Sequence, residues 1–448
     1  MAASSTEPYD VVIVGGGTGG YTAAIRAAQH GMRVALVEQA KLGGTCLHVG
    51  CIPTKALLES ASLLEKLRRA KEFGVTTGDV GFDYPVWAKR RDSVVSQLYR
   101  GVEGLMRKHK IDVVHGHGTL LPGLRVGVQS DDGDRELASR NILVATGSTA
   151  RSLPGMEIDG TRIITSEHAV MSDRVPKSIA IVGAGAIGVE FATIYQAVGT
   201  DVWLLEALPR IVPLEDPDVS TELQRLFERR GVKVRTGTVV EQVEQTESGV
   251  RLRAKRGDQV ETIDAEALLV AVGRAPVVDG FGLKEVGVSL TPRKTIEVDD
   301  SMRTSAEHIY AAGDVIGGYL LAHVAAHEGM LAIEHMAGKR VEPIVYDSVP
   351  RCTYCLPQIA SMGLTEEQAR ERGVTPKVSR FPFRANGRAL IHGETEGFVK
   401  VVADRSGTLL GLHAIGVEAT ELIAEASLAR LFQADAWEVG FSIHPHPT

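Results

Sequence analysis

The chain has 448 residues, of which 44% are hydrophobic and 23% are charged, and its formal net charge is −7. The excess of acidic residues argues against a nucleic-acid or membrane-surface role, and no stretch of 18 residues is apolar enough to span a bilayer. The first residues have neither the features of a secretion signal nor those of a transit peptide. We therefore expect a cytoplasmic protein of about three domains.

Residues 9–38 have the pattern of a strand, a glycine-rich turn, a helix and a second strand. Gly15, Gly17 and Gly20 occupy the three glycine positions of a G-x-G-x-x-G motif, and Glu38 closes the second strand. These glycines permit a tight turn, the approach of a pyrophosphate and close packing of helix on strand. The phosphates would lie at the helix N-terminus, and Glu38 would bind a ribose diol. We therefore expect a first dinucleotide site here.

Residues 177–206 repeat the same pattern, with Gly183, Gly185 and Gly188 at the glycine positions and Glu206 at the end of the second strand. The acidic residue follows the first glycine by 23 positions in both copies. One such glycine motif is weak evidence, but two copies with the acid in register are strong evidence. The chain is therefore expected to bind two dinucleotides.

Glu206 indicates which nucleotide the second site prefers. Its carboxylate would bind the 2′-hydroxyl of NAD and repel the 2′-phosphate of NADP. Arg210 is the only basic residue near it in the sequence, whereas an NADP site would place an arginine close to the position of the acid. The sequence thus favours NAD.

The four cysteines form two close pairs, Cys46 with Cys51 and Cys352 with Cys355. Close pairs in a reducing compartment indicate redox or metal chemistry. The periodicity of the apolar residues predicts a helix from Pro53 onward, so Cys46 and Cys51 would lie at its start.

A disulfide needs Cα atoms about 4.4–6.8 Å apart, and a regular helix rises about 7.5 Å over five residues. A bridge between Cys46 and Cys51 would therefore need a distorted first turn, for which Gly43, Gly44 and Gly50 supply the backbone freedom. The helix N-terminus would favour a Cys51 thiolate. Lys55, four residues further on, would add positive charge on the same face.

The run GGTCLHVGCIPTKAL at 43–57 resembles the active-site motif of the flavoprotein disulfide reductases, and most closely that of the members that oxidise dihydrolipoamide. The resemblance implies that Cys46 and Cys51 form the redox disulfide. Cys46 would exchange with the substrate and Cys51 would face the flavin. Lys55 would lie near the flavin, paired with Glu190.

Further motifs agree with this family in chain order. The runs ILVATGS at 142–148 and LLVAVGRAP at 268–276 resemble the two connections between the nucleotide domains of the family. The run HIYAAGDV at 308–315 resembles its second flavin motif. The resemblance implies that FAD is held by Gly15, Gly17, Gly20, Glu38, Thr45, Lys55, Gly118, Gly147, Asp314, Ala322 and His323. It implies that NAD is held by Gly183, Gly185, Ile187, Gly188, Glu206, Val239 and Gly273.

The last residues, SIHPHPT, resemble the H-x-H-P-T motif of the family, whose second histidine is the catalytic base. That residue is His446 here, preceded by Pro445 where a small residue is usual. In the family the histidine acts on the disulfide of the partner subunit, which implies a homodimer. The glutamate that orients it would fall at position 451, so we expect the natural chain to continue beyond Thr448.

The resemblance implies an enzyme that oxidises a dihydrolipoyl group on a partner protein with NAD⁺, in 2-oxoacid dehydrogenase or glycine cleavage complexes. Two alternatives stay open: an NADPH-dependent reductase of glutathione type, and a dinucleotide-bound interaction subunit of low activity. The expected fold is α/β, with two Rossmann-like domains and a C-terminal α+β dimerisation domain. The expected limits are 1–149 for the first part of the FAD domain, 150–274 for the NAD domain, 275–345 for the segment completing the FAD domain and 346–448 for the dimerisation domain.

Two other groups could suggest a metal. Cys352 and Cys355 form a C-x-x-C without a second such pair, and the segment VPRCTYCLP is typical of a strand. His323 and His327 lie four residues apart, but no glutamate follows the first of them. We expect structural cysteines and no metal site.

Overall fold

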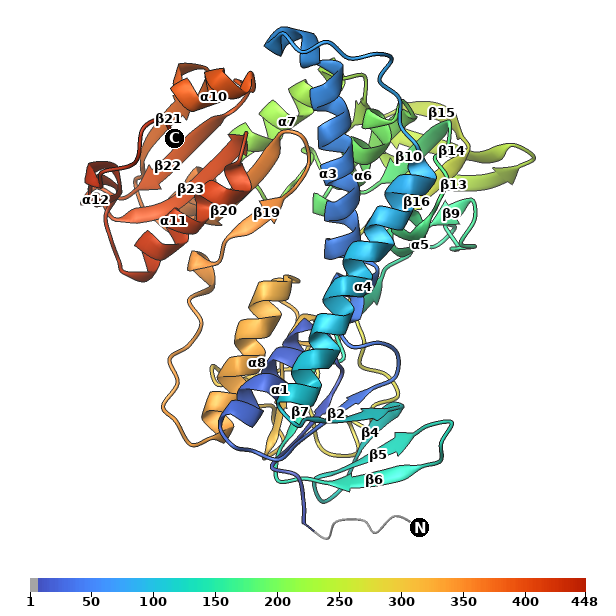
Figure 1. Ribbon diagram of the computed structural model, residues 1–448, viewed down its shortest axis with the longest axis vertical. Helices are drawn as coiled ribbons and strands as arrows, with labels where there is room; N and C mark the ends of the chain where they lie inside the picture. Colours follow the sequence, from blue (N-terminus) through green and yellow to red (C-terminus); the bar gives the residue numbers. More distant parts are fainter. Residues whose placement is uncertain (1–6) are drawn as a thin grey trace. The chain divides into compact units, whose positions relative to one another are not determined.

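The computed structural model describes residues 7–448, and the chain divides into two compact units (Figure 1). The first unit contains the described residues up to 53, together with 90–150 and 274–344. The second contains 54–89, 151–273 and 345–448. The four domain limits expected from the sequence stay a prediction.

The first unit is built on a five-stranded parallel sheet with the strand order β18-β7-β1-β2-β3. Strands that are covered on both faces read as continuous apolar runs, and the valines and isoleucine of β1 are all buried. The strands of this sheet are β1 (Val11–Val14), β2 (Val34–Glu38), β3 (Asp112–His115), β7 (Ile142–Val144) and β18 (Ile309–Ala311). Helices of this unit are α1 (Thr18–Gln29), α2 (Gly44–His48), most of α4 (Tyr84–Lys108) and α8 (Ala322–Met336), with the 3-10 turn η2 (Asp314–Ile316).

Two smaller antiparallel sheets complete the first unit. One consists of β4 (His117–Leu121), β5 (Arg125–Gln129) and β6 (Arg135–Ala138). The other pairs β8 (Ser148–Ala150) with β17 (Arg274–Pro276), the two segments at which the chain leaves and re-enters this unit.

The second unit contains a parallel sheet of the same kind, with the order β12-β11-β10-β16-β9. The repeated glycine motif follows β10, just as the first motif follows β1. The strands are β9 (Ile163–Ile164), β10 (Ser178–Val182), β11 (Asp201–Leu205), β12 (Lys233–Arg235) and β16 (Ala267–Val270), and an antiparallel sheet adds β13 (Val239–Thr246), β14 (Gly249–Arg256) and β15 (Gln259–Ala265). The helices of this part are α3 (Cys51–Arg68), which starts in the first unit, η1 (Ala70–Phe73), α5 (Ser166–Met171), α6 (Ala186–Ala197) and α7 (Pro217–Arg229).

The C-terminal part of the second unit is a five-stranded antiparallel sheet, β19-β20-β23-β22-β21, with α11 packed on it through an apolar cluster. Its strands are β19 (Arg351–Thr353), β20 (Gln358–Gly363), β21 (Lys377–Pro382), β22 (Phe398–Ala403) and β23 (Leu409–Gly416). Its helices are η3 (Tyr346–Ser348), α9 (Glu366–Glu371), η4 (Phe383–Ala385), α10 (Gly387–His392), α11 (Ala419–Leu431) and α12 (Ala436–Phe441). The expected α/β fold, with two Rossmann-like sheets and a C-terminal α+β part, is confirmed.

Within residues 7–448, no helix combines the length and the apolar character needed to cross a membrane.

In the first unit, α1 and α8 cross at two glycines and are joined by a cluster of charges. A Cβ atom on Gly329 would lie 2.5 Å from the Gly19 carbonyl oxygen, so the helix backbones touch. Beside this crossing, the carboxylate of Glu334 accepts from Arg26 Nε at 2.5 Å and lies 3.0 Å from His30 Nε2. Its hydrogen bond with His30 is the main cause that lowers the pKa of Glu334 to about 2. The charged form of Glu334 is thus stabilised by folding.

This cluster predicts a specific loss of stability in acid. The folded-state pKa of Glu334 lies below the ordinary glutamate value of 4.5, so its contribution to stability is complete above pH 4.5 and is lost as the pH falls towards 2. Thermal unfolding of the wild type should therefore show a steeper fall in Tm over this range than Glu334→Gln. Glu342→Gln, which removes an exposed carboxylate, serves as the control and should keep the wild-type slope. Equal slopes for wild type and Glu334→Gln would contradict the assignment.

Candidate functional site

The two glycine motifs have the same backbone geometry. The first glycine of each has a positive φ, +106° at Gly15 and +98° at Gly183, where a Cβ atom would meet the backbone of the neighbouring strand connection. At the third glycine a Cβ atom would lie only 1.8 Å from the oxygen of Gly15 for Gly20, and 1.9 Å from that of Gly183 for Gly188. No side chain fits at these positions, so α1 and α6 start directly against β1 and β10.

The second glycine of each motif faces open space. A Cβ atom on Gly17 or Gly185 would have no heavy atom within 4 Å. Each of the two is the N-cap residue of its helix, and no side chain caps the free N–H groups there. A helix N-terminus of this kind attracts an anion. Both motifs therefore fit the pyrophosphate of a dinucleotide.

The acidic residues also repeat in geometry. Glu38 Oε2 accepts from the Gly16 N–H at 2.7 Å, and Glu206 Oε2 accepts from the Ala184 N–H at 2.8 Å. The other oxygen of each accepts from the backbone two residues further on, at 2.7 and 2.9 Å. Both carboxylates are thus fixed beside their glycine loops, where a ribose would lie. Arg210, the basic residue near Glu206 in sequence, forms an ion pair with Glu367 at 3.2 Å.

The cysteines lie on two separate helices. The helix was predicted from Pro53, but α3 begins at Cys51, and Cys46 lies in the one-turn helix α2. A Cβ atom on Gly50 would be 2.8 Å from the Thr45 oxygen and 3.4 Å from the Cys46 Cα, so the chain folds back on itself between the helices. The break supplies the distortion that a bridge over five residues requires. Both cysteines are half-buried.

The expected pairing of Lys55 with Glu190 is present in the second unit. Lys55 Nζ donates to both Glu190 oxygens, at 2.9 and 2.8 Å, and the carboxylate is only 4% exposed. Tyr354 adds a contact that the sequence did not reveal, because its N–H donates to Glu190 at 2.9 Å and its ring lies 4.9 Å from the ammonium. The buried carboxylate therefore has the partners that it needs.

Asp314 lies at the start of η2 in the first unit, and its neighbours were also missed. Ser148 donates a short hydrogen bond to Asp314 and accepts one from Arg274 Nε at 2.7 Å. Arg274 lies 3.8 Å from Asp314 and 3.5 Å from the Thr45 hydroxyl. The strands β8 and β17 thus orient the aspartate that the resemblance assigns to FAD. The only sequence signal for this contact is that Ser148 and Arg274 each follow a glycine in the two runs that resemble the connections between the nucleotide domains.

The remaining predicted residues occupy varied positions. Gly118 is buried against Val14 and Val37, so packing alone explains this glycine. The others are distributed as follows: Gly147 and Gly273 have a positive φ and open space beside them, Ala322 and His323 begin α8, Ile187 lies in the first turn of α6, and Val239 begins β13. Their roles in binding stay predictions.

The C-terminal histidines follow α12. His446 is exposed, while His444 Nε2 lies 2.5 Å from Glu425 Oε1. The hydrogen bond to Glu425 raises the pKa of His444.

Cys352 lies in β19, as expected for a structural segment, and Cys355 is fully buried in the loop that follows. Burial is the main cause that raises the pKa of the Cys352 thiol to about 11, and burial also raises that of Cys355. Both are thus poor nucleophiles at neutral pH.

Comparisons with known proteins agree with this geometry. Residues 9–329 match the family described as pyridine nucleotide-disulphide oxidoreductase, and residues 349–448 match its dimerisation domain. Dihydrolipoyl dehydrogenases of Bacillus subtilis and Mycobacterium leprae are 45% and 44% identical, each over 98% of this chain and 95% of the relative. Among solved structures, LpdA of Mycobacterium tuberculosis has a TM-score of 0.92 at 30% identity, over 98% of this chain and 96% of that chain. The flavoprotein disulfide reductase RclA of Escherichia coli has a TM-score of 0.87 at 27% identity, over 99% and 97%.

The close contact at Gly20 predicts a large effect of a single methyl group. Gly20→Ala would force α1 away from β1 and should cost at least about 3 kcal/mol in the free energy of unfolding. Gly101→Ala is the matched control, because Gly101 is exposed in α4 with open space beside it. It should stabilise the protein by up to about 1 kcal/mol. Urea unfolding measures both changes, and a Gly20→Ala protein as stable as wild type would refute the contact.

Proposed function

Because the chain belongs to the pyridine nucleotide-disulphide oxidoreductase family, we propose that it is a dihydrolipoyl dehydrogenase, which oxidises a dihydrolipoyl group with NAD⁺. The observation that carries the proposal is the pair of cysteines on either side of the α2–α3 break, in a chain with two dinucleotide loops of one geometry. The relatives named as dihydrolipoyl dehydrogenases match over nearly the whole chain.

The residues present fit both cofactors. Gly15, Gly17, Gly20 and Glu38 would hold the adenosine diphosphate part of FAD, and Asp314 would bind its ribitol chain. Gly183, Gly185, Gly188 and Glu206 would hold NAD in the same manner. When bound, FAD supplies the electron acceptor for the reduced cysteine pair and the hydride donor for NAD⁺.

The residues of the chain perform the thiol chemistry. His446 would remove a proton from the substrate dithiol, because the thiolate is the nucleophile. That thiolate attacks Cys46, which forms a mixed disulfide and breaks the bond to Cys51. The second substrate thiol then attacks the first substrate sulfur, which breaks the bond of that sulfur to Cys46; Cys46 leaves with the proton as a thiol, and the cyclic disulfide is released. The substrate has lost two electrons, and Cys46 and Cys51 have gained them.

A homodimer would bring the histidine of one subunit to the cysteines of the other. Several large apolar side chains are exposed in the last two helices and the segments that follow each of them, which supports burial by a second copy. They are Leu428, Leu431, Phe432, Trp437, Phe441 and Ile443. The proposed external partner is a lipoyl-bearing protein of a 2-oxoacid dehydrogenase or glycine cleavage complex.

An NADPH-dependent disulfide reductase is the second candidate. It is disfavoured because Glu206 lies beside the glycine loop, where its carboxylate would repel the 2′-phosphate of NADPH. Arg210, the basic residue near it in the sequence, is paired with Glu367. An interaction subunit of low activity is a third candidate. It would have the same structural features, and only a measurement of turnover would distinguish it.

Anaerobic titration separates these candidates. Dihydrolipoamide should reduce the bound flavin of the wild type, and NAD⁺ should reoxidise it much faster than NADP⁺. Cys46→Ser should abolish reduction by the dithiol while it leaves the flavin bound. No flavin reduction in the wild type would refute the activity, and a preference for NADP⁺ would support the second candidate.

Subunit mixing tests the place of His446. Cys46→Ser and His446→Ala homodimers should each be nearly inactive. Heterodimers refolded or co-expressed from the two variants should regain activity, because one of their two sites then combines an intact Cys46 with an intact His446 of the partner subunit. Tagged heterodimers without activity would contradict a site shared between subunits. Heterodimers of the Cys355→Ser and His446→Ala variants provide the control, because Cys355 is not part of the proposed redox pair.

A further inference from the structure

The loop 207–216 joins β11 to α7 and begins directly after Glu206. Its Leu208 N–H donates to Glu206 Oε1 at 2.9 Å, and its Val212 N–H donates to the Ala184 oxygen at 2.7 Å. The Ala184 N–H in turn donates to Glu206 Oε2 at 2.8 Å. This β11–α7 loop, the glycine motif and the acidic residue thus form one closed hydrogen-bonded set. A displacement of the loop would displace the carboxylate.

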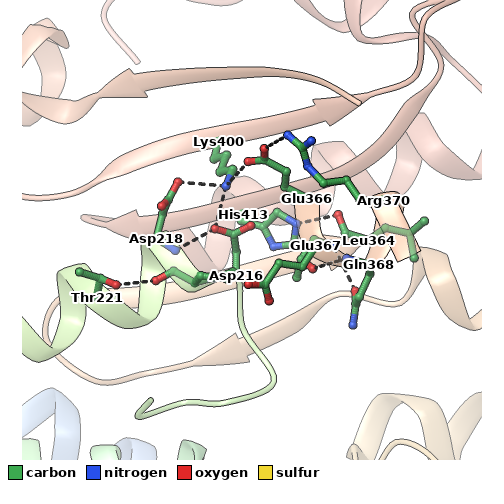
Figure 2. Close-up of polar contacts among 12 residues, drawn as sticks. Asp216, Asp218, Thr221, Leu364, Glu366, Glu367, Gln368, Arg370, Lys400 and His413 are labelled. Carbon is green, nitrogen blue, oxygen red and sulfur yellow. Dashed lines mark hydrogen bonds and ion pairs between the residues drawn. The ribbon is translucent and has the colours of Figure 1, made fainter. Parts of the chain in front are cut away.

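The far end of the β11–α7 loop is held by a buried lysine from the C-terminal sheet. Asp216 ends the loop, is fully buried and caps α7 by accepting from the Asp218 N–H at 3.0 Å. Lys400 of β22 donates from Nζ to Asp216 Oδ1 at 3.0 Å and to Asp218 Oδ2 at 2.9 Å, and Nζ lies 3.0 Å from Glu366 Oε2. Figure 2 shows the ammonium between these three carboxylates.

Charge and burial make the carboxylates of this contact dependent on the Lys400 ammonium. An ammonium has three N–H donors, and here each has a carboxylate acceptor, while the side chain is only 3% exposed. Burial alone lowers the pKa of Lys400, but the hydrogen bonds with Asp218, Asp216 and Glu366 outweigh it and raise that pKa above its usual range. Lys400 is therefore charged at neutral pH. Without it, the buried carboxylate of Asp216 would lose its ammonium partner and would face the carboxylates of Asp218 and Glu366.

A second contact holds the same loop from the same side. The guanidinium of Arg210 lies 3.3 and 3.2 Å from the two oxygens of Glu367. Glu367 follows Glu366 in α9, so one short helix contributes to both contacts. The middle of the loop and its end are thus fixed by α9 and β22.

We infer that Lys400 is a positioning residue for NAD⁺, through which the C-terminal sheet fixes the β11–α7 loop and with it Glu206. This inference rests on the proposed assignment of Glu206 to the ribose of NAD. It assigns to the region that matches a dimerisation domain a second task, the shaping of the nucleotide site in its own subunit. Lys400 would act through Asp216 and the β11–α7 loop and not by contact with the nucleotide.

The test compares the two half-reactions of the holoenzyme in Lys400→Met. In ping-pong kinetics, kcat/KM for each substrate reports its own half-reaction. We expect kcat/KM for NAD⁺ to fall about tenfold or more, as for the loss of one well-made buried contact. The value for dihydrolipoamide and the rate of anaerobic flavin reduction by the dithiol should stay unchanged. A lysine that only stabilised the fold would change both half-reactions together or neither.

The control is Arg370→Gln, because Arg370 is exposed and its ion pair is with Glu366, at 2.6 Å. It should keep both wild-type values. If Lys400→Met does not yield folded protein, Asp218→Asn replaces it, since Asp218 is half-exposed and Lys400 keeps two carboxylates. This variant should show the same selective loss to a smaller degree.

Folded Lys400→Met, or Asp218→Asn in its place, with a wild-type kcat/KM for NAD⁺ would overturn the inference. Failure of the proposed function would be recognised separately, because the wild type would then not be saturated by NAD⁺.

Discussion

The contact between the third glycine and the carbonyl of the first glycine is the constraint on which the rest of the structure depends. It occurs at Gly20 and again at Gly188, with less than 2 Å between the carbonyl oxygen and the position of a missing Cβ atom. The contact lets each helix begin directly beside a central strand, with its free N–H groups towards open space. Each acidic residue then bonds back to its own loop. The two short glycine motifs thus form two anion sites with the same geometry.

Around these loops, the reactive groups are held by residues that are distant in sequence. Glu190 belongs to the helix of the second glycine motif, yet it binds Lys55 of α3 and the backbone of Tyr354 before β20. Asp314 is oriented from β8 and β17, the strands at which the chain leaves and re-enters the first unit. The nucleotide loops are therefore local structures, whereas the groups that would complete the chemistry depend on tertiary packing.

This difference explains what the sequence could and could not predict. The glycine motifs, the acidic residues and the order of the segments are local patterns, and the structure reproduces them. The pair of Lys55 and Glu190 followed from family resemblance alone. The break that places Cys46 and Cys51 on separate helices was anticipated only as a distortion, because helical periodicity does not reveal where a turn folds back. Tyr354, Arg274 and Lys400 could not be found, since each has a partner that lies more than a hundred residues away in the sequence.

The central claim is that Cys46 and Cys51 are the electron-exchanging pair of this protein. Peptide mass spectrometry after differential alkylation tests it most directly, with thiols blocked before and after anaerobic addition of dihydrolipoamide. The account predicts a Cys46–Cys51 disulfide in the isolated protein, its loss on reduction, and Cys352 and Cys355 unchanged as thiols. A disulfide between Cys352 and Cys355 that responds to the dithiol, with Cys46 and Cys51 unaltered, would contradict it.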